Sequence, residues 1–413
     1  KKLWLVRDRL GIKPLFYAEK NGAIFFSSEI RSILASGLVD RKLNKNALVE
    51  YLQYQCVHAP NTMVEGIQML NAGSYMEISD ESISTHLFWK PWQEKHTDKD
   101  PIQIQKKIRD LLTSSVERRL VADVPFGAFL SGGIDSSLIV GIMSERLGNQ
   151  VDTFNVSFDE SEFSEAKYAR LVAKKFQTNH HEIKLNPDDF LKALPDALAS
   201  MDHPSGDGPN SWIVSRETKN QGITMALSGL GGDELFAGYE LFKRIPSIAQ
   251  RGWILSFPKA IRNMAGWAVS IARPSVASEK LKEVLRSDYF DLESLYPLIR
   301  KVLLDTQVKR LMDGKKLGQN SVYSKIKELD SFYDFESLDT LSRISVAEME
   351  TYMQNILLSD TDQMSMAHAL EVRVPFLDHT LVEYMMHVPD MVKYPHTPKK
   401  LLVDSFSDLL PSE

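Results

Sequence analysis

The sequence predicts an α/β protein, with a doubly wound parallel sheet preceded by a smaller α+β unit. Three observations predict this class. In the middle of the chain, short apolar runs alternate with stretches of helical periodicity, the order that builds parallel sheets. Two of these runs end in glycine-rich turns, at residues 131–133 and 228–232. Residues 1–90 instead carry strand-like runs bounded by Gly, Asn and Asp.

Composition sets limits on the class of protein. With 43% hydrophobic and 25% charged residues, the 413-residue chain is an ordinary globular protein long enough for two domains. The net charge of −6 argues against a general nucleic-acid binder. A single cysteine excludes an internal disulfide and a Cys-rich zinc site. The single cysteine also fits a reducing cytoplasm, where we expect the protein to act, and the acidic balance leads us to expect no nucleic-acid partner. No apolar run reaches the roughly 20 residues that span a bilayer, so we expect no membrane partner.

The first unit is expected to span residues 1–90. Residues 3–6, 23–26 and 74–78 are short apolar or alternating runs typical of strands. Residues 30–34 and 45–52 have helical spacing. A charged segment with a proline at each end follows at residues 91–101, and we interpret it as a linker to a second domain at 102–413.

The second unit begins with a helical period over residues 104–120. Its expected strands are 126–130, 151–158 and 223–227, and its expected helices follow the first two of these, reaching residues 147 and 176. From about residue 242 to the end, the pattern is mainly helical.

The strongest local signal is the turn that follows residues 126–130. Two glycines let the backbone turn sharply, and a helix begins at once with its free N–H groups facing the turn, which suits phosphate. Hydroxyl and carboxylate side chains add donors and a possible magnesium ligand. The alternative is a plain turn in which Asp135 or Ser136 only caps the helix. The residues in question are Ser131, Gly132, Gly133, Asp135, Ser136 and Ser137.

A second turn, residues 228–239, follows a later strand. Ligands in open α/β sheets gather outside the carboxyl ends of the strands, so both turns can face one nucleotide. Asp233 would then supply a second metal carboxylate beside Asp135. The alternative is a solvated turn capped by Asp233.

These motifs resemble two related families. Residues 131–137 are similar to the pyrophosphate loop of the ATP pyrophosphatases. Residues 228–239 and 364–378 resemble segments of the glutamine-hydrolysing asparagine synthetases, and residues 6–17 and 26–30 resemble the late part of that family's glutaminase domain. The resemblance implies an adenine-nucleotide α-hydrolase-like sheet preceded by the C-terminal part of an N-terminal-nucleophile glutaminase domain.

The resemblance also implies site roles. Asp135 and Asp233 would bind Mg²⁺, and Asp8 would hold the amino-acid end of glutamine. The family contacts ATP at positions matching Phe129, Leu130, Val156, Ser228 and Gly229, besides the loop. The implied reaction adenylates a carboxylate, such as that of aspartate, and ammonia from glutamine then displaces AMP. The implied partners are therefore small molecules, and a homodimer is left open.

The sequence departs from the family at three places. The glutaminase nucleophile is an N-terminal cysteine upstream of this chain, and we interpret Cys56 as a small buried hydrophobe. We therefore expect no glutamine hydrolysis from these residues. The family has a lysine that stabilises charge in the amide-forming step, and we expect it beyond residue 413. Lys399 and Lys400 are interpreted as surface-helix residues. The chain is thus interpreted as a fragment. Leu230 replaces a usual acidic residue.

Leu230 leaves the acceptor open between aspartate and another carboxylate, such as a sugar uronic acid of surface polysaccharides. Residues 202–210 either line the acceptor pocket or form a surface loop. His180 and His181 are expected to have a structural or nucleotide-edge role, since neighbours on a strand point to opposite faces. A nucleotide-binding protein without turnover and a tRNA-modifying enzyme are the remaining hypotheses.

Overall fold

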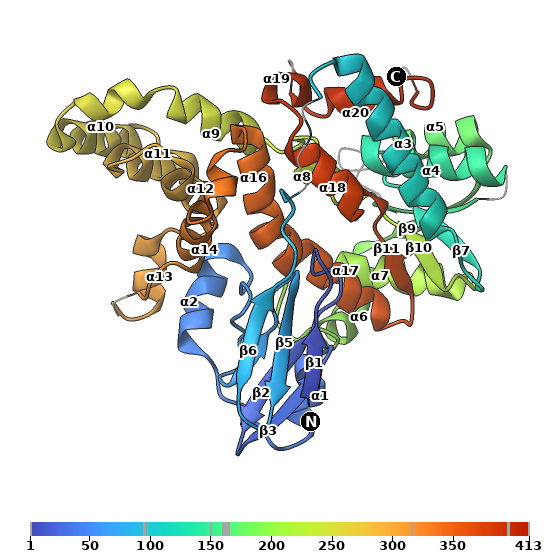
Figure 1. Cartoon of the computed structure of the whole chain (residues 1–413), viewed down its shortest axis with the longest axis horizontal. Coiled ribbons are helices and arrows are strands. Elements are labelled where there is room, and N and C mark those ends of the chain that lie inside the picture. Colours follow the sequence, from blue (N-terminus) through green and yellow to red (C-terminus); the bar gives the residue numbers. More distant parts are fainter. Residues whose placement is uncertain are drawn as a thin grey trace.

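A five-stranded parallel sheet forms the centre of the second unit (Figure 1). The computed structural model describes residues 2–93, 96, 98–148, 151–158, 166–314, 317–394 and 397–411. The strand order is β11-β10-β7-β8-β9, and every neighbouring pair is parallel. From central β7 the chain moves outward to β9 and then crosses to β10 on the other side, so the predicted doubly wound sheet is confirmed. The strands are β7 (Phe126–Phe129), β8 (Asp152–Phe158), β9 (Asn179–Leu185), β10 (Met225–Leu227) and β11 (Glu371–Arg373).

Helices cover both faces of this sheet. Right-handed crossovers place α4 (Ile134–Leu147) and α5 (Ala166–Phe176) on one face, and α6 (Pro187–Ala199) and α7 (Gly208–Asn220) on the other. Helix α3 (Pro101–Arg119) packs on α4. The apolar side chains of α3 that the helical period predicts are inaccessible to solvent at Ile104, Ile108, Leu112 and Val116.

Two small antiparallel sheets and two helices make up the first unit. The expected strands at 3–6, 23–26 and 74–78 are confirmed, and three further strands pair with them. One sheet has the order β1-β5-β6 and the other β3-β2-β4. The elements are β1 (Lys2–Val6), β2 (Phe16–Lys20), β3 (Ala23–Ser27), α1 (Ile30–Ala35), α2 (Lys45–Tyr54), β4 (Ile67–Met69), β5 (Ser74–Ser79) and β6 (Ile83–Leu87).

The main core continues across the expected linker. Trp92 is buried within that segment, and its ring lies 5.3 Å from the ring of Phe335. Leu10 and Tyr54 of the first unit join the same apolar cluster. Residues 94, 95 and 97 lie outside the described residues, and the division into domains at 91–101 stays a prediction.

The rest of the chain is helical, as expected, apart from β11. Helix α16, the π-helix η3 and helix α17 follow one another without a break. Short π-helical segments are often found near functional sites. Helices α10 and α11 project from the body at the upper left of Figure 1. Among the described residues, no helix is long and apolar enough to cross a membrane. The elements are α8 (Gly232–Leu235), α9 (Leu241–Ala249), η2 (Gly252–Ser256), α10 (Lys259–Ala272), α11 (Val276–Arg286), α12 (Leu292–Arg300), α13 (Asp305–Leu311), α14 (Ser321–Asp330), α15 (Tyr333–Glu336), α16 (Thr340–Glu348), η3 (Met349–Leu358), α17 (Ser359–Met366), η4 (Pro375–Leu377), α18 (His379–Met386), α19 (Asp390–Lys393) and α20 (Lys400–Ser405).

Candidate functional site

The first glycine turn leaves the N-terminus of α4 open. Gly132 has a φ of 90°, and Gly133 is the N-cap residue without a side-chain cap. The alternative in which Asp135 or Ser136 caps the helix is therefore wrong. The Ser136 hydroxyl donates to the Gly133 carbonyl at 3.1 Å and lies 3.0 Å from the Ser131 hydroxyl. Free helix N–H groups and hydroxyls at one point form an anion-binding arrangement.

The second glycine turn lies directly against the first. A Cβ on Gly229 would stand 2.9 Å from the Ser136 nitrogen, and one on Gly232 would stand 2.4 Å from Cγ of Asp135. Only glycine allows backbones to approach this closely. Helix α8 also has a glycine, Gly231, as its N-cap, with no side-chain cap, so Asp233 does not cap this turn.

Lys399 joins the two turns. Its ammonium Nζ lies 2.7 Å from Oδ2 of Asp135 and 2.7 Å from Oδ1 of Asp233. The expectation that Lys399 is a surface residue was wrong, because its side chain is only 14% exposed. The backbone explains the error: Lys399 has a left-handed φ of 56°, and its N–H donates to the Phe236 carbonyl at 3.1 Å. The polar sequence around it carries no signal of this contact.

Lys400, in contrast, is the surface residue that we expected. Its side chain is 42% exposed and pairs with Asp404 one helical turn later, at 2.8 Å. Two adjacent lysines thus have different surroundings because the helix α20 begins between them.

Burial shapes the charges of this site. It raises the pKa of Asp135 to about 6, although the Lys399 ammonium opposes the rise. Burial would lower the pKa of Lys399, but the two carboxylates raise it above its ordinary value. Among the described residues, Oδ1 of Asp135 is buried and accepts no hydrogen bond. An orphaned carboxylate oxygen of this kind is suited to a cation.

The carboxylates of this site suit a Mg²⁺ ion that takes its other ligands from substrate phosphates. No group of three or more His, Cys, Asp or Glu side chains that could hold a metal is found in the described part of the chain. Mg²⁺ commonly uses one or two carboxylates together with substrate phosphates and waters. Asp135 and Asp233 fit that role, because the phosphates would complete the coordination.

A cavity of about 410 Å³ opens between the two turns. Leu130 is inaccessible beneath it, and Val156 packs in a separate apolar cluster. Gly132 and Ser137 line a neighbouring cavity of about 260 Å³ instead. The individual binding roles remain predictions. The predicted residues that line the main cavity are Phe129, Ser131, Gly133, Asp135, Ser136, Ser228, Gly229, Leu230 and Asp233.

Glu234 and Tyr239 also line the cavity, and neither has an assigned role from the sequence, although both stand in the 228–239 motif. The Tyr239 hydroxyl donates to Oε1 of Glu234 at 2.8 Å. Burial raises the pKa of Glu234 to about 7. The ring of Tyr352 from η3 meets the Tyr239 ring edge-on at 6.0 Å, and the Arg300 guanidinium lies 3.9 Å from the Tyr352 ring centre. Tyr239 therefore connects the lining of the cavity to η3 through its ring contact with Tyr352.

Residues 202–210 lie mainly at the junction with the first unit. Asp202 and His203 line a separate cavity of about 380 Å³ together with Lys13, Ser28 and other residues. Ser205 donates to Asp360, and burial raises the pKa of Asp360 to about 7. In the described chain none of residues 202–210 lines the nucleotide cavity, so their acceptor role stays a prediction.

Asp8 supports a loop. Its Oδ1 accepts from the N–H groups of Leu10 and Ile12 at 3.1 and 2.9 Å, and its Oδ2 accepts from Lys13 at 2.9 Å. The glutamine-binding role of Asp8 stays a prediction, and these contacts are those of a residue that fixes a turn.

The adjacent histidines of β9 have separate contacts. Nδ1 of His180 lies 2.9 Å from the Thr153 hydroxyl, whereas the His181 ring stacks on Phe154 at 4.8 Å. The two side chains point to different partners, as expected for neighbours on a strand, and their structural or nucleotide-edge role stays a prediction.

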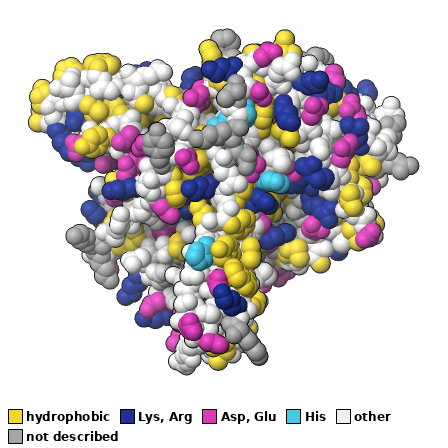
Figure 2. All heavy atoms as spheres, in the orientation of Figure 1, with side chains coloured by type: hydrophobic (Ala, Val, Ile, Leu, Met, Phe, Trp, Pro, Cys, Tyr) yellow, Lys and Arg dark blue, Asp and Glu magenta, His cyan; other side chains and the backbone are white. Residues whose placement is uncertain are grey.

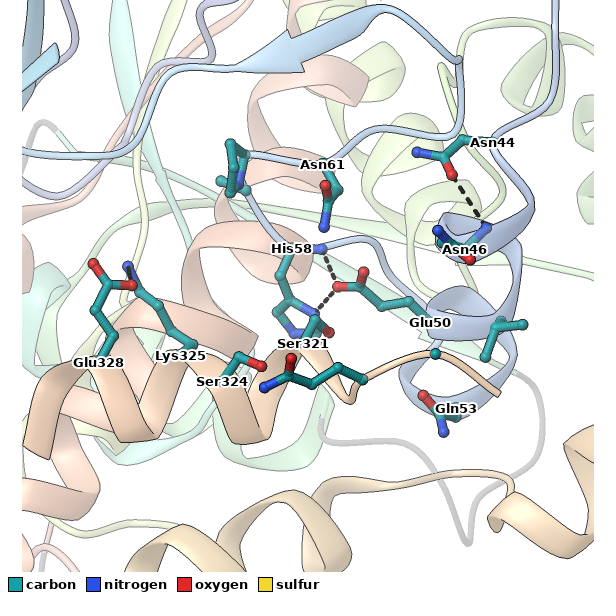
Figure 3. A pocket seen from close by; sticks show the side chains of 15 residues that line it. Asn44, Asn46, Glu50, Gln53, His58, Asn61, Ser321, Ser324, Lys325 and Glu328 are labelled. Carbon is teal, nitrogen blue, oxygen red and sulfur yellow. Dashed lines mark hydrogen bonds and ion pairs between the residues drawn. The ribbon is translucent and has the colours of Figure 1, made fainter. Parts of the chain in front are cut away.

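A cavity of about 420 Å³ lies away from the nucleotide turns, between α2, the loop after it and α14 (Figure 3). Glu50 and His58 point toward each other there, with Oε1 of Glu50 2.5 Å from Nδ1 of His58 (Figure 3). The other ring nitrogen lies 3.5 Å from Sγ of Cys56. Cys56 is 1% exposed and does not line the cavity, which confirms that it is a buried residue.

The fold and the paired glycine turns define an α/β protein with an anion-binding arrangement at the edge of its parallel sheet and an N-terminal antiparallel unit. The asparagine synthase family model matches residues 107–413, and the glutamine amidotransferase domain model matches residues 1–89. The chain belongs to the asparagine synthase family.

Three relatives show the range of this similarity. Asparagine synthetase [glutamine-hydrolyzing] 1 of Bacillus subtilis is 30% identical over 99% of this chain and 63% of its own length. Asparagine synthetase [glutamine-hydrolyzing] 3 of the same organism is 27% identical over 100% and 63%. Amidase chyE of Penicillium rubens is 27% identical over 95% and 62%. This chain thus spans under two thirds of the length of these relatives.

Proposed function

We propose that the full-length protein forms amides at the expense of ATP. A carboxylate is adenylated in the cavity between the two glycine turns, and ammonia derived from glutamine then displaces AMP. The single observation that carries this proposal is the meeting of Asp135, Asp233 and Lys399 beside the open N-terminus of α4. Fixed charges and helix N–H groups stabilise a transferring or departing phosphate without moving during the reaction.

Each part of the site has a task in this reaction. The N–H groups of the first turn and the Ser131 and Ser136 hydroxyls hold the β- and γ-phosphates that leave as pyrophosphate. Lys399 neutralises charge that develops on the phosphates. Mg²⁺, when bound through Asp135 and Asp233, supplies the remaining positive charge. The cavity floor, including Leu230, then limits which carboxylate reaches the α-phosphorus.

Aspartate is the first acceptor to consider, because two of the relatives are named asparagine synthetases. A carboxylate other than aspartate, such as a sugar uronic acid, is the second. Leu230 favours it, since the leucine side chain lines the cavity and can neither bind the ammonium group of aspartate nor move a proton.

The test is pyrophosphate release by the full-length protein with ATP, Mg²⁺ and ammonium. Aspartate and a panel of uronic acids are supplied as acceptors in separate reactions, and the amide product is identified by mass spectrometry. Acceptor-dependent pyrophosphate with amide product supports the proposal, and the acceptor that gives it decides between the two candidates. ATP binding without turnover of any acceptor would contradict it.

A further inference from the structure

The projecting pair α10 and α11 is a fixed unit. The buried guanidinium of Arg262 donates to the carbonyls of Leu285 and Ser287 at 2.8 and 2.6 Å, at the end of α11. A Cβ on Gly266 would stand 3.1 Å from Cα of Lys282, so the helices pack backbone to backbone. The pair α10 and α11 therefore holds its side chains in a defined arrangement away from the rest of the molecule (Figure 1).

Helix α10 has its apolar face outward. The side toward α11 carries Arg262, Gly266 and Ser270, all buried. A helix of a globular protein ordinarily shows the reverse, with its apolar side on the core. At about 100° per residue the exposed apolar residues form one stripe along the opposite side. Their exposed fractions are 53% for Ile261, 71% for Met264, 61% for Trp267 and 58% for Ile271.

The apolar surface continues into the turn before α10. Trp253 and Phe257 are exposed there, with their rings 6.0 Å apart, and hydrophobic side chains gather at this end of the molecule in Figure 2. Extended apolar patches on a protein surface mark interaction sites. Tryptophan and phenylalanine beside aliphatic residues are typical of helices that lie in a membrane interface.

The charged side chains of residues 241–278, which include α10 and the turn before it, are all basic. Residues 241–278 contain six basic residues and no acidic one, whereas the whole chain has a net charge of −6. Arg251 donates to the carbonyl and hydroxyl of Ser247, at 2.9 and 2.7 Å, and no described carboxylate pairs with it. Arg273 is exposed just past the end of α10. The partner of the apolar stripe should therefore be negatively charged.

We propose that this face docks on an anionic lipid membrane surface, with α10 lying in the plane of the headgroups. Its apolar stripe enters the acyl boundary, and Arg251 and Arg273 contact lipid phosphates. Burial of the apolar face and attraction of the basic residues to anionic lipid both strengthen membrane binding. A second copy joined through the same face would bring the two basic segments together, which is unfavourable. This docking does not depend on the proposed reaction.

The test is sedimentation of the full-length protein with vesicles. We expect binding to vesicles of phosphatidylcholine with about a quarter phosphatidylglycerol, and about tenfold weaker binding to phosphatidylcholine alone. The double variant M264S/W267S should lose binding by a factor of about ten or more. R251Q/R273Q should remove the preference for anionic lipid. The matched control L191S/M391S removes apolar side chains of comparable exposure from elsewhere on the surface and should bind like wild type.

Equal binding of the M264S/W267S variant and wild type would overturn the proposal, as would equal loss in the control. Absence of vesicle binding by a folded full-length protein would also overturn it, because another segment then covers the stripe. Sedimentation velocity adds a further readout. A concentration-dependent dimer that the M264S/W267S change abolishes, without vesicle binding, assigns the face to a second copy instead. Thermal melting of every variant checks that the fold is retained.

Discussion

One ammonium shared by two carboxylates sets the chemistry of the nucleotide cavity. Asp135 is buried, and a buried carboxylate in isolation would be costly to keep charged. Lys399 offsets this cost at 2.7 Å while leaving Oδ1 of Asp135 without a partner among the described residues. The proposed binding of phosphate and Mg²⁺ rests on this arrangement of one ammonium and one unpartnered carboxylate oxygen.

We predict that Lys399→Met lowers acceptor-dependent pyrophosphate release about a hundredfold or more, the scale found for loss of one charge-stabilising group. The carboxylates of Asp135 and Asp233 then face each other without compensation. Lys400→Met is the control, since that side chain is 42% exposed and pairs with Asp404 on the surface of α20. Steady-state kinetics of the full-length proteins measure the effect, and a Lys399→Met enzyme as active as wild type would remove the lysine from the reaction.

A second prediction concerns the contact between the two turns. Gly232→Ala places a Cβ 2.4 Å from Cγ of Asp135, so the carboxylate must move or the turns must separate. We expect a loss of stability of about 1–3 kcal/mol and weaker binding of ATP with Mg²⁺. Urea denaturation and titration calorimetry measure the two effects. Gly252→Ala, which meets no atom within 4 Å, should change neither.

At the scale of elements, the periodicity of the sequence predicts which segments form helices or strands and which of their side chains are buried. The apolar spacing of α3 and the run before the first turn predict their burial directly. Strand β11 was not predicted, because three residues carry no periodicity and their conformation comes from parallel pairing with β10. The contact of Lys399 with Asp135 and Asp233 was missed for a related reason. It depends on a backbone hydrogen bond from Lys399 to Phe236, and these two residues are far apart in the sequence.

Helix α18 supplies a prediction with a pH dependence. Asp378 caps it, with Oδ1 accepting from Thr380, and its Oδ2 lies 2.8 and 3.1 Å from guanidinium nitrogens of Arg118 and Arg119 on α3. Burial alone would raise the pKa of Asp378, but these hydrogen bonds hold it well below its usual range. The stabilisation is therefore complete above the unfolded pKa of about 4 and is lost as the pH falls below it.

We expect Asp378→Asn to cost about 2–4 kcal/mol of unfolding free energy at pH 7, since two guanidinium groups lose their counter-charge. At about pH 3 the wild type has begun to lose the same contribution, so the difference between the two proteins should narrow. Urea denaturation at both pH values measures it. A difference that stays constant with pH would mean that the charge of Asp378 contributes nothing to the fold.

At the scale of the whole molecule, polar contacts connect the first unit to the loop between α6 and α7 and to α17. The Asp202 carboxylate accepts from the N–H groups of Ile30 and Arg31 at 2.7 and 3.2 Å, at the start of α1, and from Nε of Arg31 at 3.1 Å. Its side chain is 4% exposed. Lys13 pairs with Asp362 of α17 nearby, at 2.5 Å. A segment of the nucleotide-binding unit thus holds the start of a helix in the amidotransferase unit.

We predict that Asp202→Ala in the full-length protein uncouples the two halves of the reaction. Each charge-assisted hydrogen bond contributes about 1.5–3 kcal/mol, and the loss of the lower of these amounts from the junction corresponds to about a tenfold change in an equilibrium. Amidation driven by glutamine should therefore fall about tenfold, while amidation driven by added ammonium, which needs only the nucleotide cavity, stays within about threefold. Asp40→Ala is the control, because that carboxylate is 89% exposed and lies 3.9 Å from Lys20.

The ratio of the two activities is the decisive measurement. Glutamine-driven and ammonium-driven rates that fall together would place the effect of Asp202→Ala in the folding of the whole chain. A fall in the glutamine-driven rate alone would place it at the junction, because the cavity that contains Asp135, Asp233 and Lys399 shares no lining residue with the cavity that contains Asp202.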